Sequence, residues 1–425
     1  MMKNKILVSQ NKVYSVLLIA ILIVIYLINE NINQVNNTVL ILLNIGLVFI
    51  AFSQFKMDLI TYMVLCIEIL IIPITIQYYT GTSYGMLEMG IVPLHLSEFL
   101  SYTFIYCVVF LSISIFSDFK KQEFNLIETP GLDLNNLNIL FNNVVAVVFT
   151  IVAFPRLSMH IQGAGERFNM LLPGHAWNQL AIVALLFNLK YLSKYTSVKI
   201  VYIFVSLWFL INGERADIFG LIIGIVFYYF LSNKIQLSNF KKIAYFICLL
   251  VFVFVLNMIA SIRQGISISF IQSIKGILVT PTISDVSYIF NASIDLFERF
   301  GTTHSQIFIS NIHSIIPLYD NITFNNIFSL SYPDPGGQAW ITQPLLDWGF
   351  PGLILGPLLD FILIRLVIIK SNSFFKMEYL ALLCLVPRAV WYGREYTFTT
   401  LIFFVPLMYV LNLILLKIRV NKNID

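Results

Sequence analysis

Charged residues are scarce in this chain: only 11% of its 425 residues are Asp, Glu, Lys or Arg, whereas 58% are hydrophobic. This balance, with a mean hydropathy of +0.84, lies outside the range of soluble globular proteins and predicts a polytopic membrane protein. The formal net charge of +4 is too small to indicate a nucleic-acid partner. The position of the few charges is therefore more informative than their sum.

Cysteine is scarce as well, and a cleavage site for a signal peptide is lacking. The four cysteines lie inside apolar runs, with spacings that match neither a metal site nor a disulfide framework. We therefore expect no metal and no cofactor. Residues 1–12 form a short basic leader that enters a long apolar segment without a small-residue cleavage site, so this segment is predicted to remain as a helix.

Long apolar segments, in contrast, are abundant. A helix must cover about 30 Å of hydrocarbon to cross a bilayer. The twelve segments that we predict to do so are residues 13–29, 38–54, 58–79, 97–116, 138–154, 177–192, 197–212, 216–232, 242–262, 350–369, 377–393 and 396–417. We expect an all-α protein with one integral membrane domain over residues 1–425, cytoplasmic termini, and long outer loops at 155–176 and 263–349.

Lysine and arginine lie on opposite sides of these predicted spans. With the N-terminus inside, every cytoplasmic connection is basic, and Lys275 is the only one of seventeen lysines outside. Seven of the nine arginines lie outside: Arg156, Arg167, Arg215, Arg263, Arg299, Arg388 and Arg394. The planar fork of Arg binds phosphate or carboxylate oxygens in pairs. The arginines therefore predict an anionic ligand on the outer side, although any one of them can also be an interfacial anchor.

The hexapeptide NGERAD, residues 212–217, joins two apolar runs and carries three ionisable groups. Glu214 and Asp217 suit the first turn of the following helix, where the helix dipole favours acids. Arg215 opposes that dipole, but together with the free backbone N–H groups of a helix N-terminus it makes a good anion site. A lipid diphosphate at the outer leaflet would be such an anion.

The longer outer loop contains two recognisable stretches. Residues 284–300 place their apolar side chains on one helical face, which predicts an interfacial helix that lies along the membrane. Residues 331–340, SYPDPGGQAW, are rich in Pro and Gly and predict a turn or cap. The rings of Tyr332, Trp340 and Trp348 suit the faces of sugars, with packing as the alternative.

Three of the ionisable residues inside predicted spans stand out by their position: Glu68 and Asp360, near the middle of the third and tenth spans, and Arg388, in the outer half of the eleventh. A charge in lipid is costly unless it is paired or hydrated, so each should face the interior of the bundle. They predict a polar cavity or, for Glu68 and Asp360, pairing with an arginine that locks helices together.

The turn with Arg215 before an apolar helix resembles the Gly-x-Arg element of the bacterial O-antigen polymerases (Wzy). The stretch QPLLDWGFPGLIL, residues 343–355, resembles the end of their large outer loop, with an acidic residue and a Gly-Phe-x-Gly entry to the next helix. About twelve helices and two enlarged, Arg-rich outer loops extend the similarity over most of the chain. The implied fold resembles glycosyltransferases of the GT-C type.

The resemblance implies a metal-independent glycosyltransferase of the bacterial inner membrane, with its active side in the periplasm. It would polymerise polyprenyl-diphosphate-linked oligosaccharide repeat units into O-antigen or a related surface polysaccharide, with a chain-length regulator protein as a further partner. The leaving diphosphate needs preorganised positive charge, for which the candidates are Arg215, Arg299, Arg388, Arg394, Arg156 and Arg167. The acceptor hydroxyl needs a base, for which the candidates are His304 and His313, with Asp347, Glu214 and Asp217 as rivals.

Other classes of protein fit less of the sequence. An O-antigen ligase shares the lipid diphosphate donor and the Arg and His chemistry, and the sequence separates it only weakly. A flippase or polysaccharide transporter would show internal repeats and a long connection after the sixth helix, whereas the longest loop here follows the ninth. An intramembrane protease would need a nucleophile motif such as Gly-x-Ser-Gly, which is absent.

Overall fold

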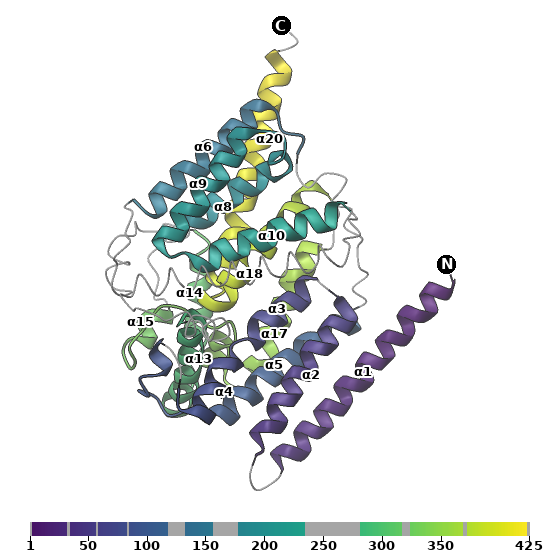
Figure 1. Ribbon diagram of the computed structural model, residues 1–425, viewed down its shortest axis with the longest axis vertical. Coiled ribbons are helices and arrows are strands. Elements are labelled where there is room, and N and C mark those ends of the chain that lie inside the picture. Colours follow the sequence, from purple (N-terminus) through teal and green to yellow (C-terminus); the bar gives the residue numbers. More distant parts are fainter. Residues whose placement is uncertain are drawn as a thin grey trace.

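The part of the chain that the structure describes is helical (Figure 1). The computed structural model describes residues 2–31, 35–56, 58–82, 85–117, 132–155, 177–233, 281–316, 324–368 and 372–422. In chain order its elements are α1 (Met2–Glu30), α2 (Asn37–Phe55), α3 (Leu59–Glu68), α4 (Ile71–Thr80), η1 (Gly85–Leu87), α5 (Leu96–Phe116), α6 (Asn136–Ala153), α8 (Trp177–Asn188), η2 (Leu189–Tyr191), α9 (Thr196–Asn212), α10 (Arg215–Asn233), α13 (Pro281–Phe300), α14 (Gln306–His313), α15 (Phe324–Phe328), α16 (Thr342–Trp348), α17 (Gly352–Ile368), α18 (Ser373–Tyr392), α19 (Glu395–Phe398), the π-helix η3 (Thr399–Phe404) and α20 (Val405–Lys422). No strand forms within these ranges, which confirms the all-α expectation.

Six helices in these ranges are long and apolar enough to cross a membrane: Lys12–Glu30, Asn37–Phe55, Leu59–Leu87, Leu96–Phe116, Asn136–Ala153 and Glu395–Ile418. They match the first five and the last of the predicted spans, and they confirm the membrane character of the chain. The predicted span 242–262 lies outside the described residues. The remaining five spans, and the orientation read from the lysines, stay predictions.

The helices gather into groups that their order in the sequence does not predict (Figure 1). One group contains α1, α2, α3, α5 and α17, and a second contains α6, α8, α9 and α20. The helices α10 and α18 pack against each other between the two groups, while α13, α14 and α15 lie at the lower left of the view. Segments far apart in the chain, such as α10 and α18, are therefore direct neighbours.

Five buried asparagines join α6, α8 and α20, and we call them the amide cluster: Asn138, Asn142, Asn143, Asn188 and Asn412. Asn412 donates to Asn142 Oδ1 at 3.0 Å and accepts from Asn138 Nδ2 at 3.0 Å. Asn188 accepts from Asn142 Nδ2 at 3.1 Å and donates to Asn143 Oδ1 at 2.9 Å. Such amides hydrogen-bond across helices in an apolar setting without bringing in a charge. The cluster therefore holds the second group of helices together by neutral contacts.

The helices α10 and α18 pack so closely that only glycine fits at two positions of α10. A Cβ on Gly220 would lie 1.8 Å from the carbonyl oxygen of Cys384, and one on Gly224 would lie 2.0 Å from the Sγ of the same residue. Small residues four positions apart let two membrane helices approach in this way. This close packing places the NGERAD turn, at the start of α10, beside the half of α18 that is predicted to face the outer side of the membrane.

The helix α13 contains residues 284–300, which were predicted to form an interfacial helix. Most of this helix is enclosed by other parts of the protein and does not lie on the surface. Every residue from 286 to 296 is buried. Neighbouring backbone groups satisfy part of its polar face. Ser287 donates to the Leu70 carbonyl at 2.8 Å, at the break between α3 and α4, and Asn291 donates to a carbonyl of the loop before α5 at 2.8 Å. The prediction that this helix lies along the membrane is therefore corrected.

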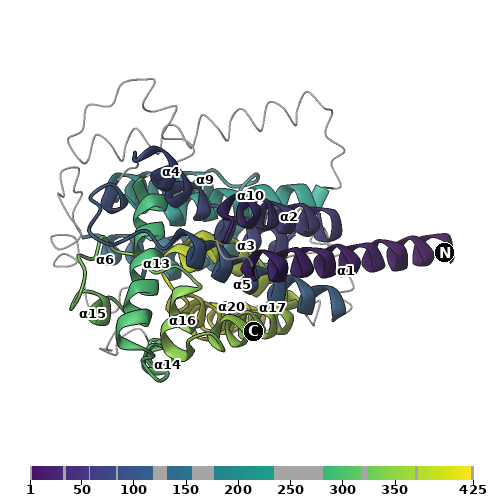
Figure 2. The ribbon, with the colours of Figure 1, turned by 90° about the horizontal axis from the view of Figure 1, so that it is seen from below.

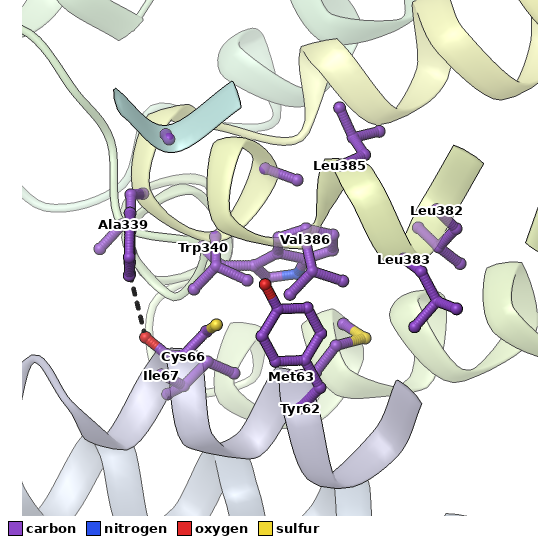
Figure 3. Close-up of a cluster of buried hydrophobic side chains, with 14 of the residues drawn as sticks. Tyr62, Met63, Cys66, Ile67, Ala339, Trp340, Leu382, Leu383, Leu385 and Val386 are labelled. Atoms are coloured by element: carbon purple, nitrogen blue, oxygen red, sulfur yellow. Dashed lines mark hydrogen bonds between the residues drawn. The ribbon is translucent and has the colours of Figure 1, made fainter. Parts of the chain in front are cut away.

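The Pro- and Gly-rich stretch 331–340 caps the end of α18, as predicted. The Gln338 N–H donates to the Trp391 carbonyl and the Trp340 N–H donates to the Val390 carbonyl, both at 2.9 Å. These bonds satisfy carbonyls that the last turn of a helix leaves without an intrahelical partner. Figure 3 shows that the side chain of Trp340 then lies among apolar residues of α3 and α18.

Candidate functional site

The NGERAD turn joins α9 to α10 with only Gly213 and Glu214 between the two helices. Gly213 has a φ of 81°, the left-handed conformation that favours glycine at the end of a helix. The Glu214 N–H donates to the Phe209 carbonyl at 2.9 Å, and α10 begins at Arg215. The turn therefore places all three of its ionisable groups at the start of α10.

Arg388 on α18 forms ion pairs with the two acids of that turn, and the three formal charges sum to −1. Its Nη1 bonds to Glu214 and lies 3.7 Å from Asp217 Oδ2, and its Nη2 donates to the Tyr396 hydroxyl at 3.0 Å. Two side-chain amides of α8 donate to Asp217 at 2.6 and 2.8 Å. The three charged side chains are at most 9% exposed. This network ties α10 to α18.

The Arg388 network corrects two sequence-based interpretations. The helix dipole alone does not explain the two acids, because Glu214 pairs with Arg388, and Asp217 accepts from two amides of α8 and lies 3.7 Å from Arg388. Because Arg388 is buried between two carboxylates, whose combined formal charge exceeds its own, the geometry does not support Arg388 as a diphosphate ligand. For the same reason it does not support either acid as the catalytic base.

Arg394 forms a second buried network. Its Nε and Nη2 donate to the two carboxylate oxygens of Asp360 on α17, both at 3.0 Å. Its remaining donors reach the Trp340 carbonyl at 2.7 Å and the Tyr106 hydroxyl at 2.5 Å. The pairing alternative for Asp360 is thereby confirmed, and Arg394 has no free fork for a phosphate. Glu68 forms no such pair, since its Oε1 is buried without a hydrogen-bond partner in the described ranges.

Arg215 differs from both of these arginines. It is half-buried, and among the residues that the structure describes it forms neither an ion pair nor a side-chain hydrogen bond. Tyr392 and Asp285 interact with it through electrostatics alone. Burial raises the pKa of Asp285 to about 6, although the Met86 N–H at 2.9 Å and the charge of Arg215 both lower it. A cation at a helix N-terminus that is not held in an ion pair is suited to binding an anion.

A second cluster surrounds Asp295, nearer the other end of α13, and we call it the Asp295 cluster: Asp295, His95, Glu298, Arg299 and Tyr332. Asp295 is 6% exposed, pairs with Arg299 Nε at 2.8 Å and faces His95 Nε2 at 3.3 Å. It also accepts a hydrogen bond from Tyr332, whose pKa is raised to about 12 by burial and by this bond. His95 Nδ1 lies 3.7 Å from Glu298, and Arg299 remains 57% exposed. This cluster is thus both charged and accessible.

Asp347, a candidate base, is a helix cap. Its carboxylate accepts from the Thr303 hydroxyl at 2.5 Å, from Ile307 N at 3.1 Å and from Phe308 N at 2.8 Å. These bonds satisfy N–H groups of the first turn of α14, and the residue is 1% exposed. A carboxylate held in this way is not available to a substrate hydroxyl. The structure therefore does not support Asp347 as the base.

The histidines His304 and His313 are exposed. His304 contacts the Thr302 hydroxyl at 3.1 Å and has a φ of 50°, a strained conformation for a residue with a side chain. Figure 2 shows α14, which contains His313, at the lower end of α13, and α10 higher in the view. The structure therefore does not bring these two candidate bases to the diphosphate site expected at Arg215.

The three aromatic candidates for saccharide contact have different surroundings. Trp340 is 2% exposed, with the guanidinium of Arg394 5.0 Å from its ring centre. A sugar cannot reach this ring, so packing is its role and the saccharide prediction is corrected for Trp340. Tyr332 and Trp348 are half-buried, and Trp348 donates to the Ser305 hydroxyl at 2.7 Å. Their saccharide contacts stay predictions.

The sequence analysis did not identify His95 as a candidate base. His95 and Asp295 are 200 positions apart, and only the fold brings them together. The available signal was the spacing of Asp295, Glu298 and Arg299, which places the three on one helical face. Arg156 and Arg167 lie outside the described residues.

Comparison of the chain with protein-family models, with curated proteins and with solved structures found no match. The function is therefore argued from the residues and their geometry.

Proposed function

We propose that this protein is a glycosyltransferase that joins polyprenyl-diphosphate-linked oligosaccharide repeat units into O-antigen or a related surface polysaccharide. The donor is a growing saccharide on polyprenyl diphosphate, and the acceptor is one lipid-linked repeat unit. The resemblance of the NGERAD turn and of residues 343–355 to the O-antigen polymerases supports this choice. The observation that carries it is that Arg215 has neither an ion pair nor a side-chain hydrogen bond in the described ranges.

Arg215 carries the proposal because the alternatives have other roles. Arg388 and Arg394 are buried in ion pairs that hold helices together. Arg215 lies at the N-terminus of α10 without an ion pair in the described ranges, and Asp285 offsets its charge only through longer-range electrostatics, so a ligand that brings negative charge gains the most there. A lipid diphosphate has this charge and enters from the membrane.

The reaction involves two diphosphates, one on the donor lipid and one on the acceptor lipid. It therefore needs two positively charged sites. Arg215 has Asp285 as its acidic neighbour and Arg299 has Asp295, and these two acids are ten residues apart on α13. That spacing corresponds to about 15 Å along a helix. The separation leaves room for the sugars of one repeat unit between the two lipid diphosphates.

In the reaction itself, the acceptor hydroxyl attacks the anomeric carbon of the donor saccharide. The bond from that carbon to the phosphate oxygen breaks, and the diphosphate leaves with the electron pair. Positive charge that is already in place stabilises the leaving group more strongly as its own charge develops, which lowers the barrier. Arginine is suited to this task because it stays charged and binds phosphate oxygens in pairs.

The proposed function is tested by lipopolysaccharide gels of a strain that lacks the gene. Loss of a polymerase leaves a single repeat unit on the lipid A core. Bare core would indicate a ligase or a flippase and would refute the proposal. Restoration of the full ladder by the wild-type chain completes the test.

In this strain we expect Arg215→Ala to abolish long-chain polysaccharide while the protein accumulates in the membrane at the wild-type level. Arg215→Lys should restore part of the ladder, because it keeps the charge and loses the fork. The matched control is Arg365→Ala, which removes an exposed arginine from the last turn of α17 and should give a normal ladder. A normal ladder from Arg215→Ala would show that this residue holds no diphosphate.

A further inference from the structure

We propose that His95 is the general base that activates the acceptor hydroxyl, that Asp295 positions it, and that Arg299 binds the leaving diphosphate beside it. This inference rests on the proposed function and adds to it the location of the reaction centre. It draws on the Asp295 cluster, in which three segments distant in the sequence meet at one buried carboxylate.

His95 is held in the manner that a general base requires. The buried carboxylate of Asp295 faces Nε2 at 3.3 Å, so a proton on Nε2 is directed to Asp295 and the lone pair of Nδ1 stays free. The backbone is fixed as well, because the His95 N–H donates to Asn291 Oδ1 at 2.9 Å. The side chain is 17% exposed, which anchors the ring and still leaves it accessible to a substrate.

Arg299 provides positive charge at the same place. Its Nε is paired with Asp295, but the side chain is 57% exposed and its two terminal nitrogens have no hydrogen-bond partner in the part of the chain that is described. Two such nitrogens can bind two phosphate oxygens at once. Asp295 therefore links the base and the cation through its two carboxylate oxygens, because Oδ1 faces His95 Nε2 and Oδ2 forms the ion pair with Arg299 Nε.

The chemical step balances with these residues. The acceptor hydroxyl gives its proton to His95 Nδ1 as its oxygen bonds to the anomeric carbon, and the bond from that carbon to the phosphate oxygen breaks. The electron pair leaves with the diphosphate, whose charge Arg299 stabilises. Asp295 stabilises the imidazolium, which then returns its proton to solvent.

Other groups near the His95 ring, and one other histidine, are the alternative candidates for the base. Glu298 lies 3.7 Å from Nδ1 and is 44% exposed, so it is the competing base of this cluster. Glu98 stands three positions after His95 on α5, and its carboxylate accepts from Ser97 at 2.7 Å. His304 contacts only the Thr302 hydroxyl and has no carboxylate partner in the described ranges. His95 combines an orienting carboxylate with an adjacent cation.

The decisive variant is His95→Gln, because glutamine can still donate to Asp295 but has no basic nitrogen. We expect no long-chain polysaccharide in the deletion strain and normal accumulation of the protein. In proteoliposomes supplied with lipid-linked repeat units extracted from the deletion strain, the rate should fall by roughly 10²- to 10⁴-fold, the usual contribution of a general base. The control Glu88→Gln, an exposed acid in the loop before His95, should give the wild-type rate.

The variant Asp295→Asn tests whether Asp295 positions the His95 ring. It should lower kcat with little change in KM, and it should move the acid limb of the rate–pH profile to lower pH, because a neutral partner no longer stabilises the imidazolium. A purely structural role would leave the shape of that profile unchanged. If His95→Gln does not accumulate, this profile decides: a shifted limb supports the inference and an unchanged one overturns it.

The outcomes separate this inference from the proposed function. If wild-type protein does not extend the lipid-linked repeat units, the polymerase itself is refuted. If wild-type protein extends them and His95→Gln does so at the same rate, only the role of His95 is refuted. Loss of activity in Glu298→Gln, His304→Gln or His313→Gln with retention in His95→Gln would assign the base to that other residue.

Discussion

The amide cluster of α6, α8 and α20 and the arginine networks of α18 and α19 are both buried and polar, but they are built from different chemistry. In the amide cluster, neutral side chains donate to and accept from one another. In the arginine networks, full charges meet carboxylates: Arg388 meets Glu214 and Asp217, and Arg394 meets Asp360. Both regions join helices that are distant in the sequence.

Burial and polarity alone therefore do not identify a functional site in this protein. Each of the two regions satisfies most of its own groups, and so each is explained by the packing of helices. The functional candidates are the charges that remain available after this structural use, namely Arg215 and the exposed side of Arg299. Predictions that disturb each kind of region test this distinction.

The largest expected effect is that of Arg388→Ala. It leaves two buried carboxylates without their cation, and breaking a buried ion pair in this way typically costs about 3–5 kcal/mol. We expect low accumulation in the membrane and a lower thermal unfolding temperature in detergent. Adding Glu214→Gln should recover part of the loss, because one uncompensated charge is removed. Wild-type stability of the single variant would show that the network does not hold α10 to α18.

A smaller effect is expected for Asn412→Ala in the amide cluster. Hydrogen bonds between helices in a membrane contribute about 0.6 kcal/mol each on average, and Asn412 takes part in several. We therefore expect a loss of about 1–2 kcal/mol in unfolding free energy with the polysaccharide ladder retained. The exposed Asn326→Ala on α15 is the control. A lost ladder at normal stability would assign the amide cluster a functional role.

The smallest expected effect concerns Asp285, whose pKa is raised to about 6. Below this pH the carboxyl is neutral and no longer offsets the charge of Arg215, so binding of a diphosphate should strengthen as the pH falls from 7.5 to 5.5. The change should be less than about tenfold, the factor of one pKa unit. A synthetic polyprenyl-diphosphate sugar is the appropriate probe, because both of its phosphates are esterified and keep a constant charge in this range.

Asp285→Asn provides the control for this pH dependence. It should bind the same probe at pH 7.5 as tightly as the wild-type chain does at pH 5.5, with little further change between the two values. A pH dependence that persists in Asp285→Asn would show that another group near Arg215 titrates.

The sequence predicted local turns and helix ends better than it predicted which distant side chains contact each other. The start of α10 at NGERAD and the cap formed by residues 331–340 follow from local turn chemistry, and both are confirmed. Trp340 was misjudged because an aromatic ring beside a loop has no local mark of burial. The pairing of Glu214 with Arg388 joins positions 174 apart, so no spacing rule applies to it.

By itself, the sequence determined that this chain is helical, apolar and sparing in charge, because hydrophobic content and helical periodicity are local properties. It also determined which side chains could bind an anion. Only the tertiary structure decided which charges neutralise one another and which do not, because ion pairs form between distant segments and depend on separations of a few ångströms. Arg388 and Arg394 were assigned to structure in this way, while Arg215 and the Asp295 cluster kept the capacity to act on a ligand.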